Sequence, residues 1–172
     1  RSKGFLRGGV GDEYPVHPLA AEVFFVLSFD RLTDTELFSQ NRFTEVYEDL
    51  YWREMQLSAK EVIIDQLVER ELIDPERVAF TGLSEGAAQV FYALINSDRF
   101  STFISSGGVR TYASYYMSNT GGRDGDVAFL RGKPGDPESF WPSMALDGNA
   151  EDVDAPLLLN VSDMESYFAA PN

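Results

Sequence analysis

A glycine-flanked serine lies between a stretch with the pattern of a β-strand and a stretch with the pattern of a helix. Residues 82–86 read Gly-Leu-Ser-Glu-Gly, which fits the motif G-x-S-x-G. A strand predicted over residues 77–81 comes just before it, and a helix predicted over residues 85–95 follows the serine directly. In that context the motif indicates a nucleophile elbow, a sharp turn that raises the Ser84 hydroxyl above the end of a buried strand. The alternative is an ordinary glycine-flanked turn.

The flanking glycines and the following helix suit this turn to chemistry. Gly82 and Gly86 lack the Cβ atoms that we expect would collide with neighbouring backbone in so sharp a turn. The helix N-terminus directs positive potential toward a developing oxyanion, so the backbone N–H of Glu85 is a candidate oxyanion donor. Gly8 and Gly9 follow a short apolar stretch, in the kind of loop that usually offers the second donor in hydrolases.

Strands and helices are predicted to alternate along the chain. We predict strands over residues 23–29, 77–81, 103–105 and 156–161, and helices over residues 43–72 and 85–95. Such alternation implies crossovers between parallel strands, so the fold class is α/β, with a mostly parallel sheet flanked by helices. Together with the elbow, this predicts an α/β-hydrolase fold. Residues 109–138 are irregular and rich in glycine, and we interpret them as an insertion or a long loop.

Within the longer predicted helix, apolar spacing selects one face for burial, whereas Lys60 is among the charged side chains predicted to face water. The predicted apolar positions are Ala59, Val62, Ile63 and Leu67. Pro75 disfavours helix in the residue before it, so we expect the helix to close there.

A serine nucleophile needs a base, and the base needs an acid that orients it. In this fold the chain order is serine, acid, histidine, and the acid follows a later strand. Asp163 lies just beyond the strand predicted over residues 156–161, and Glu165 is a possible substitute two residues on. Asp154 precedes that strand and would lie at the wrong end of the sheet. The alternative for Asp163 is a solvated loop carboxylate.

No histidine follows Asp163, and His17 is the one histidine of the chain. His17 precedes the first predicted strand, which is the wrong order for this fold, and we interpret it as a surface or substrate-lining loop residue. We therefore expect the sequence to be incomplete at its C-terminus. We also expect it to be inactive by itself, because Ser84 without a base keeps its proton.

Composition excludes several other classes of function. The formal net charge of −14 should repel phosphate backbones, so we expect no nucleic-acid partner. The absence of cysteine excludes disulfides and thiolate metal sites, and we expect no cofactor or metal; Asp124 and Asp126 do not fit a calcium loop. The longest apolar run is too short to span a membrane. The composition fits either the bacterial cytoplasm or the periplasm, and it does not indicate an oligomeric state.

Three parts of the sequence around these features resemble prolyl oligopeptidase-type serine peptidases. They are the elbow region at residues 74–86, the strand at 103–108, and the strand and acid loop at 154–163. Residues 4–15 and 26–30 are similar to the lasso-peptide isopeptidase branch of that family, and the first of these runs is the more specific. The resemblance spans nearly the whole chain. It implies an α/β-hydrolase fold in which Ser84 is the nucleophile, Asp163 the triad acid and the Glu85 N–H one oxyanion donor.

The sequence also departs from that family. Arg7 stands where many relatives have an oxyanion-binding tyrosine before the paired glycines, which leaves Gly8 and Gly9 open as the second donor. The N-terminal β-propeller and the histidine-bearing C-terminal segment that such enzymes carry are absent. We therefore expect residues 1–172 to be a partial catalytic domain. Arg7, Tyr112 and Tyr115 are candidates to line the substrate site, although the tyrosines also fit satellite packing.

These observations favour a serine hydrolase that cleaves an amide or isopeptide bond in a peptide through a Ser-His-Asp triad and an acyl-enzyme. Two alternatives remain. An esterase or acyl hydrolase can use the same fold, because fold does not fix substrate. A non-catalytic binding domain of the same fold is the other, and a histidine after Asp163 in a longer sequence would argue against it.

Overall fold

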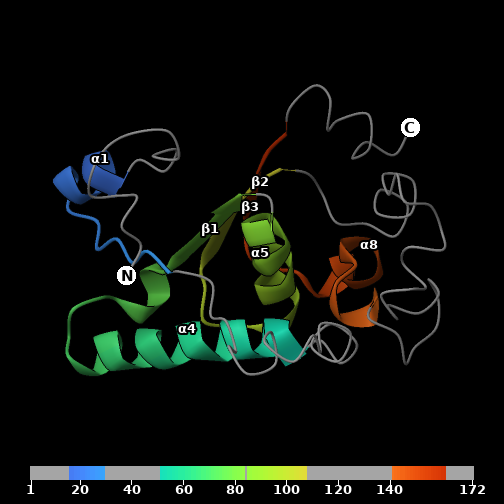
Figure 1. The fold of residues 1–172 in the computed structure, drawn as a ribbon, viewed down its shortest axis with the longest axis horizontal. Helices are drawn as coiled ribbons and strands as arrows, with labels where there is room; N and C mark the ends of the chain where they lie inside the picture. Colours follow the sequence, from blue (N-terminus) through green and yellow to red (C-terminus); the bar gives the residue numbers. More distant parts are fainter. Residues whose placement is uncertain (1–15, 30–50, 84, 108–140, 162–172) are drawn as a thin grey trace, which may run out of the picture. The chain divides into compact units, whose positions relative to one another are not determined.

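The computed structural model describes residues 16–29, 51–83, 85–107 and 141–161 (Figure 1). The chain divides into two compact units, Arg1–Asp34 and Thr35–Asn172, each considered by itself below. The loop predicted over residues 109–138 lies outside the described residues.

Three parallel strands form the sheet of the second unit. They are β1 (Ala79–Leu83), β2 (Thr102–Ser106) and β3 (Leu157–Asn160), in the order β1-β2-β3. The predicted strands over 77–81, 103–105 and 156–161 are confirmed, with the first shifted by two residues toward the elbow. The shift arises because Pro75–Arg77 form the 3-10 turn η1, in which the Asp74 carboxylate accepts a hydrogen bond of 2.9 Å from the Glu76 N–H.

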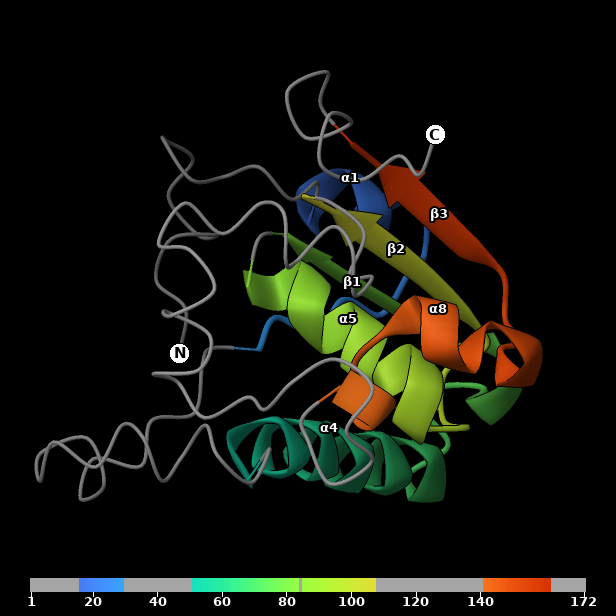
Figure 2. The same ribbon diagram turned by 90° about the vertical axis from the view of Figure 1, so that its right-hand side faces the viewer.

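Helix α5 (Glu85–Asn96) is the centre of the hydrophobic core. Its sequence predicts one apolar side, but the structure buries it all round, with Val90, Phe91 and Ala93 fully inaccessible to solvent. One side of α5 packs on β1 and β2, and the others contact α4, the short helix α8 (Leu146–Asn149) and the 3-10 turn η2 (Trp141–Ser143) (Figure 2). A helix covered on every side has to be apolar on every side, which explains its composition.

Three short elements between residues 141 and 152 were not predicted from the sequence. They are η2, α8 and a second 3-10 turn, η3 (Ala150–Asp152). A side-chain amide fastens this region to the C-terminal end of α5, because Asn96 Nδ2 donates to the carbonyl oxygens of Tyr92 at 2.7 Å and Ser143 at 2.9 Å.

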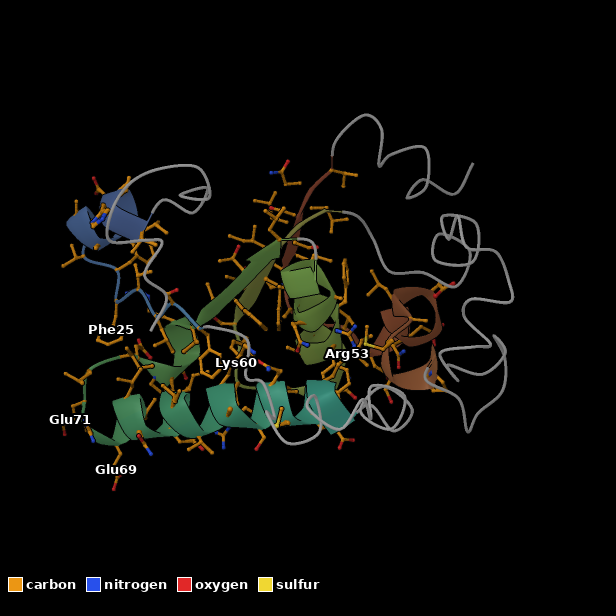
Figure 3. All side chains as sticks on the ribbon, viewed as in Figure 1. Phe25, Arg53, Lys60, Glu69 and Glu71 are labelled. Atoms are coloured by element: carbon orange, nitrogen blue, oxygen red, sulfur yellow. The ribbon has the colours of Figure 1, made fainter. Side chains whose placement is uncertain are left out.

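Helix α4 (Tyr51–Glu69) buries a different face from the predicted one. Leu57 and Ile64 are in the core, whereas Val62 is 52% exposed. The buried face also carries polar side chains, with Arg53 and Gln56 both at 5% exposure or less. Figure 3 shows Arg53 and Lys60 on the side of α4 that faces the sheet and α5, while Glu69 points away. The apolar spacing failed because polar residues occupy part of the buried stripe.

The end of α4 is set by its own backbone rather than by Pro75. Glu71 has a φ of 57°, and the next amide, that of Leu72, donates to the Leu67 carbonyl at 3.0 Å. The Glu71 amide donates to the Val68 carbonyl at 2.8 Å, which completes a Schellman motif. The helix therefore ends at Glu69, and the predicted end near Leu72 is wrong by about one turn.

The predicted strand over residues 23–29 is wrong in this structure. Helix α1 (Val16–Ala21) precedes it, and the Phe24 amide bonds back to the Leu19 carbonyl at 3.1 Å. Val23 turns the chain with a φ of 68° and is 95% exposed, and residues 24–29 have no regular secondary structure. A strand needs ladder partners for its backbone groups, and the described sheet consists of β1, β2 and β3.

Lys60 on α4 lies against the sheet instead of facing water. Its Nζ donates to the Gln56 carbonyl at 3.0 Å and lies 5.4 Å from the centroid of the Phe80 ring on β1. Burial disfavours the charged form and lowers the pKa of Lys60 to about 8. The hydrogen bond to the Gln56 carbonyl and the cation–π contact with Phe80 compensate the ammonium for part of the hydration that it loses.

The lowered pKa of Lys60 predicts a rise in stability between pH 8 and pH 10. In that window the unfolded chain, with an ordinary lysine pKa, holds a proton that the folded chain has released, so the free energy of unfolding increases with pH. Lys60→Met should abolish the rise, measured as urea midpoints at intervals from pH 7 to pH 10. The upper limit excludes most of the opposing effect of Tyr92, whose pKa is raised to about 12 by burial and by Glu54 and Glu61, against the opposing effect of Arg53. That group lowers the free energy of unfolding mainly between pH 10 and pH 12, where the unfolded tyrosine has lost the proton that the folded one keeps.

The matched control is Arg70→Met, which removes an exposed cation just after the end of the same helix. It should keep the rise. Parallel stability curves for the unsubstituted protein and Lys60→Met across the whole range would contradict the prediction.

Candidate active site

The C-terminal ends of the three strands form one edge of the sheet. The register aligns Leu83 of β1 with Ser106 of β2, and Ser106 with Asn160 of β3. Ser84 follows Leu83 directly, and Asp163 follows Asn160 by three residues; both lie outside the described residues. Two strand spacings separate β1 from β3, or about 10 Å. The chain therefore leaves β1 toward Ser84 and β3 toward Asp163 at the same edge of the sheet, on either side of β2.

Gly82, in β1, is packed directly against the start of α5. A Cβ atom placed on Gly82 would collide with the carbonyl carbon and oxygen of Gly86, and would lie 3.0 Å from the amide nitrogen of Ala87. Only glycine allows strand and helix to approach so closely. The predicted steric role of Gly82 is thus confirmed.

The same prediction for Gly86 is wrong in this structure. Apart from its two chain neighbours and the backbone of its own helix, no atom of the described residues lies within 4 Å of a Cβ built on Gly86. In the contact between strand and helix, the backbone carbonyl of Gly86 occupies the space that a side chain on Gly82 would need.

Helix α5 begins at Glu85, immediately after Ser84. The first amides of a helix have no intrahelical acceptor, and the helix dipole adds positive potential at this end. The backbone N–H groups at the start of α5 are therefore at the C-terminal edge of the sheet, next to the predicted nucleophile. This is the position that the predicted oxyanion donor, the N–H of Glu85, requires.

Asp154 lies at the opposite edge. It precedes β3. Two residues later, the Pro156 carbonyl accepts hydrogen bonds from the Phe103 amide at 3.0 Å and from the Thr102 hydroxyl at 3.2 Å, both at the start of β2. Six residues separate Asp154 from Asn160, roughly 20 Å of extended chain. Its carboxylate is thus remote from the edge at which Ser84 leaves the sheet.

The other predicted site residues lie outside the described residues: Arg7, Gly8, Gly9, Tyr112, Tyr115 and Glu165. His17, predicted on a loop, is exposed on helix α1 of the first unit. Within the described ranges no group of three or more histidine, aspartate or glutamate side chains could hold a metal ion. No helix of the described part is long and apolar enough to cross a membrane.

The conformation and hydrogen bond of Gly107, at this edge of the sheet, could hardly be predicted from the sequence. Gly107, directly after β2, has a φ of 107°, and its amide donates to the Asn160 carbonyl at 3.1 Å. From sequence alone, the glycine pair that begins at Gly107 marks only the end of a strand. A glycine directly after a predicted parallel strand was the available signal, but the partner of its amide could not be read from it.

The chain is similar to a peptidase of known type. No protein-family profile matches it. The lasso peptide isopeptidase AtxE2 of Asticcacaulis excentricus is 37% identical over 179 aligned positions, which cover 99% of this chain and 26% of that protein. This chain thus spans about a quarter of the length of that relative.

Two solved structures of AtxE2 have the same fold. A serine-to-alanine variant with an astexin bound matches with a TM-score of 0.81 at 33% identity, covering 97% of this chain and 27% of the other. The apo form matches with a TM-score of 0.77 at 32% identity, covering 94% of this chain and 26% of the other. These matches confirm the predicted α/β-hydrolase fold and the predicted resemblance to the lasso-peptide isopeptidase branch of the prolyl oligopeptidase-type peptidases.

The contact between Gly82 and Gly86 predicts unequal effects of two alanine substitutions. Gly82→Ala should lower the free energy of unfolding by about 1–3 kcal/mol or more, because strand and helix have to separate to admit the methyl group. Gly86→Ala, the matched control in the same motif, should not lower it, because the added methyl group meets open space and alanine favours the helix over glycine by up to about 1 kcal/mol. Urea denaturation measures both. Equal losses in the two variants would contradict the steric assignment.

Proposed function

From the homology with a lasso peptide isopeptidase, we propose that this chain forms most of the catalytic domain of a serine hydrolase that cleaves amide or isopeptide bonds in peptides. The observation that carries the proposal is a sequence match over 99% of the chain. The close approach of Gly82 to Gly86 supports it independently, because this contact brings together the strand and the helix that Ser84 joins in the sequence.

In the proposed reaction the Ser84 oxygen attacks the carbonyl carbon of the scissile amide. A histidine base takes the hydroxyl proton and then delivers it to the leaving amine, which leaves an acyl-enzyme on Ser84. Water, deprotonated by the same base, then attacks the acyl carbon. The bond between that carbon and the Ser84 oxygen breaks, and the base returns the proton to the serine oxygen as the product acid leaves. The base is proposed to follow Asp163 in the natural full-length chain, in the order that this fold uses.

The start of α5 supplies the electrostatic part of the mechanism. Negative charge develops on the carbonyl oxygen during attack, and the Glu85 N–H donates to it with support from the helix dipole. A second donor from the loop of Gly8 and Gly9 is proposed on the same grounds. Such donors act without reorganisation because the helix holds them in place before the substrate binds.

A peptide substrate is supported by the relative rather than by this chain's own pocket. The AtxE2 variant whose structure holds an astexin carries a serine-to-alanine substitution. A bound ligand in a variant without one serine hydroxyl fits an enzyme in which serine performs the chemistry and other residues bind the peptide. We propose the same division for this protein, with Arg7, Tyr112 and Tyr115 as candidate substrate contacts.

Ser84 is predicted to be the residue that a fluorophosphonate probe labels in the full-length protein. Ser84→Ala should abolish labelling and lower kcat by roughly a millionfold, while peptide binding survives, because only the nucleophile is lost. The control is Ser101→Ala at the opposite edge, which removes a hydroxyl that donates to the Val78 carbonyl at 3.2 Å. Labelling at another serine, or activity retained by Ser84→Ala, would refute the assignment.

Asp163 is predicted to orient the base, so Asp163→Asn should lower kcat by about 10⁴-fold with little change in KM or stability, because the imidazole loses the partner that fixes its tautomer. Asp154→Asn is the control, since Asp154 precedes β3 at the far edge. Steady-state hydrolysis of an activated ester measures both variants. A larger loss of kcat in Asp154→Asn would show that the other carboxylate performs this role.

A further inference from the structure

We infer that the side chains of Ser106 and Asn160 form a polar subsite that binds the main chain of the peptide substrate next to Ser84. The inference rests on the proposed function, because that function supplies the peptide. In this scheme the two side chains hold the substrate and take no part in breaking its bond. They therefore bear on the affinity for a peptide rather than on the chemistry at Ser84.

Ser106 and Asn160 are the last residues of their strands, in the same row as Leu83. The register pairs Leu83 with Ser106, and Ser106 with Asn160. Neighbouring strands lie about 4.8 Å apart, and consecutive Cα atoms lie about 3.8 Å apart. The Ser106 Cα is thus within about 9 Å of the Ser84 Cα, and the Asn160 Cα within about 13 Å. An extended peptide covers these distances in about three or four residues.

The Ser106 side chain points away from the helix that packs on β1 and β2. Side chains alternate between the two faces of a strand. On β2, Phe103 and Ser105 are 1% exposed and face α5, whereas Ser106 is half-buried on the opposite face. Leu83 shares that opposite face, because Gly82 contacts the start of α5, and Leu83 is 40% exposed. Figure 2 shows α5 against the other side of the sheet.

Asn160 lies beside Ser106 on the same open face. Residues that are in register on neighbouring strands direct their side chains to the same side of a sheet, and Asn160 is exposed. Its carbonyl accepts a hydrogen bond from the Gly107 amide, but that is a backbone group. In the described part of the chain, the side chains of Ser106 and Asn160 make no hydrogen bond. Both are therefore available to a ligand at this edge.

The chemistry of the two side chains complements a peptide unit. A serine hydroxyl both donates and accepts, and an asparagine carboxamide offers donors on its nitrogen and an acceptor oxygen. A peptide unit presents one N–H and one C=O. Apolar surface lies one row further from the edge on the same face, where Ile104 is half-buried and Leu158 is 61% exposed. Uncharged polar groups beside apolar surface suit the main chain and a side chain of a peptide.

The test uses the natural full-length protein and an astexin as the peptide. In a Ser84→Ala background, which blocks turnover, Ser106→Ala and Asn160→Ala should each weaken astexin binding by about two- to tenfold, the effect of losing one hydrogen bond between uncharged groups. Isothermal titration calorimetry measures the affinity. With Ser84 intact, both variants should hydrolyse p-nitrophenyl acetate, which has no peptide main chain, with unchanged kcat/KM.

The matched control is Thr102→Val. It removes a hydroxyl from the same face of β2, at the opposite edge of the sheet, where Thr102 donates to the Pro156 carbonyl. It should change neither astexin affinity nor ester hydrolysis. Urea denaturation reports the folded fraction of each variant. Asn160 is exposed, so Asn160→Ala should fold and carry the test even if Ser106→Ala does not.

Two results would overturn the inference. One is an unchanged astexin affinity in the folded variants. The other is a parallel loss of ester hydrolysis, which would mark a disturbed active site rather than a lost peptide contact. Failure of the proposed function gives different results. Absence of astexin binding by the Ser84→Ala protein would refute the peptide substrate and the subsite with it, and ester hydrolysis retained by Ser84→Ala would refute the nucleophile alone.

Discussion

The approach of Gly82 to Gly86 is the contact on which the rest of the structure depends. It brings the backbone of β1 against the start of α5, at a separation that no side chain would permit. Once strand and helix meet there, the first free amides of α5 and the residue after Leu83 share one edge of the sheet. The same contact seats α5 across β1 and β2, so the position of the core follows from the turn.

Burial of α5 on all sides constrains which residues α5 and its neighbouring elements can carry. Alanine and valine let the sheet and the surrounding helices come close, and Phe91 fills the centre. Helix α4 covers this core with a face that includes Arg53, Gln56 and Lys60, whose polar groups have to keep their bonds while buried. The Lys60 ammonium is an example: it loses hydration by burial, but it donates to the Gln56 carbonyl and lies over the face of the Phe80 ring.

Sequence predicted the elements whose signal is local and strong. The three strands and α5 follow from short segments in which apolar residues recur at strand or helix spacing. The positions of Ser84 and Asp163 after strands follow from these elements. Other features could not be read. The end of α4 depends on a glutamate, Glu71, at positive φ. The buried face of α4 contains polar residues, so apolar spacing did not identify it. The strand expected over 23–29 has the right composition, but composition does not supply ladder partners. The amide partner of Gly107 depends on how separate strands align.

The amide of Asn96 makes α5 a mechanical link as well as a core element. One of its two hydrogen bonds ties the last turn of the helix to the Ser143 carbonyl in η2, while the other, to the Tyr92 carbonyl, stays within α5. In the sequence, Ser84 precedes the first turn. A helix of this length spans about 18 Å and is stiff, so a tilt of about 3° at the Asn96 end displaces the other end by about 1 Å. The region around η2 and α8 thus holds one end of a stiff helix whose other end carries the predicted oxyanion donor, the N–H of Glu85.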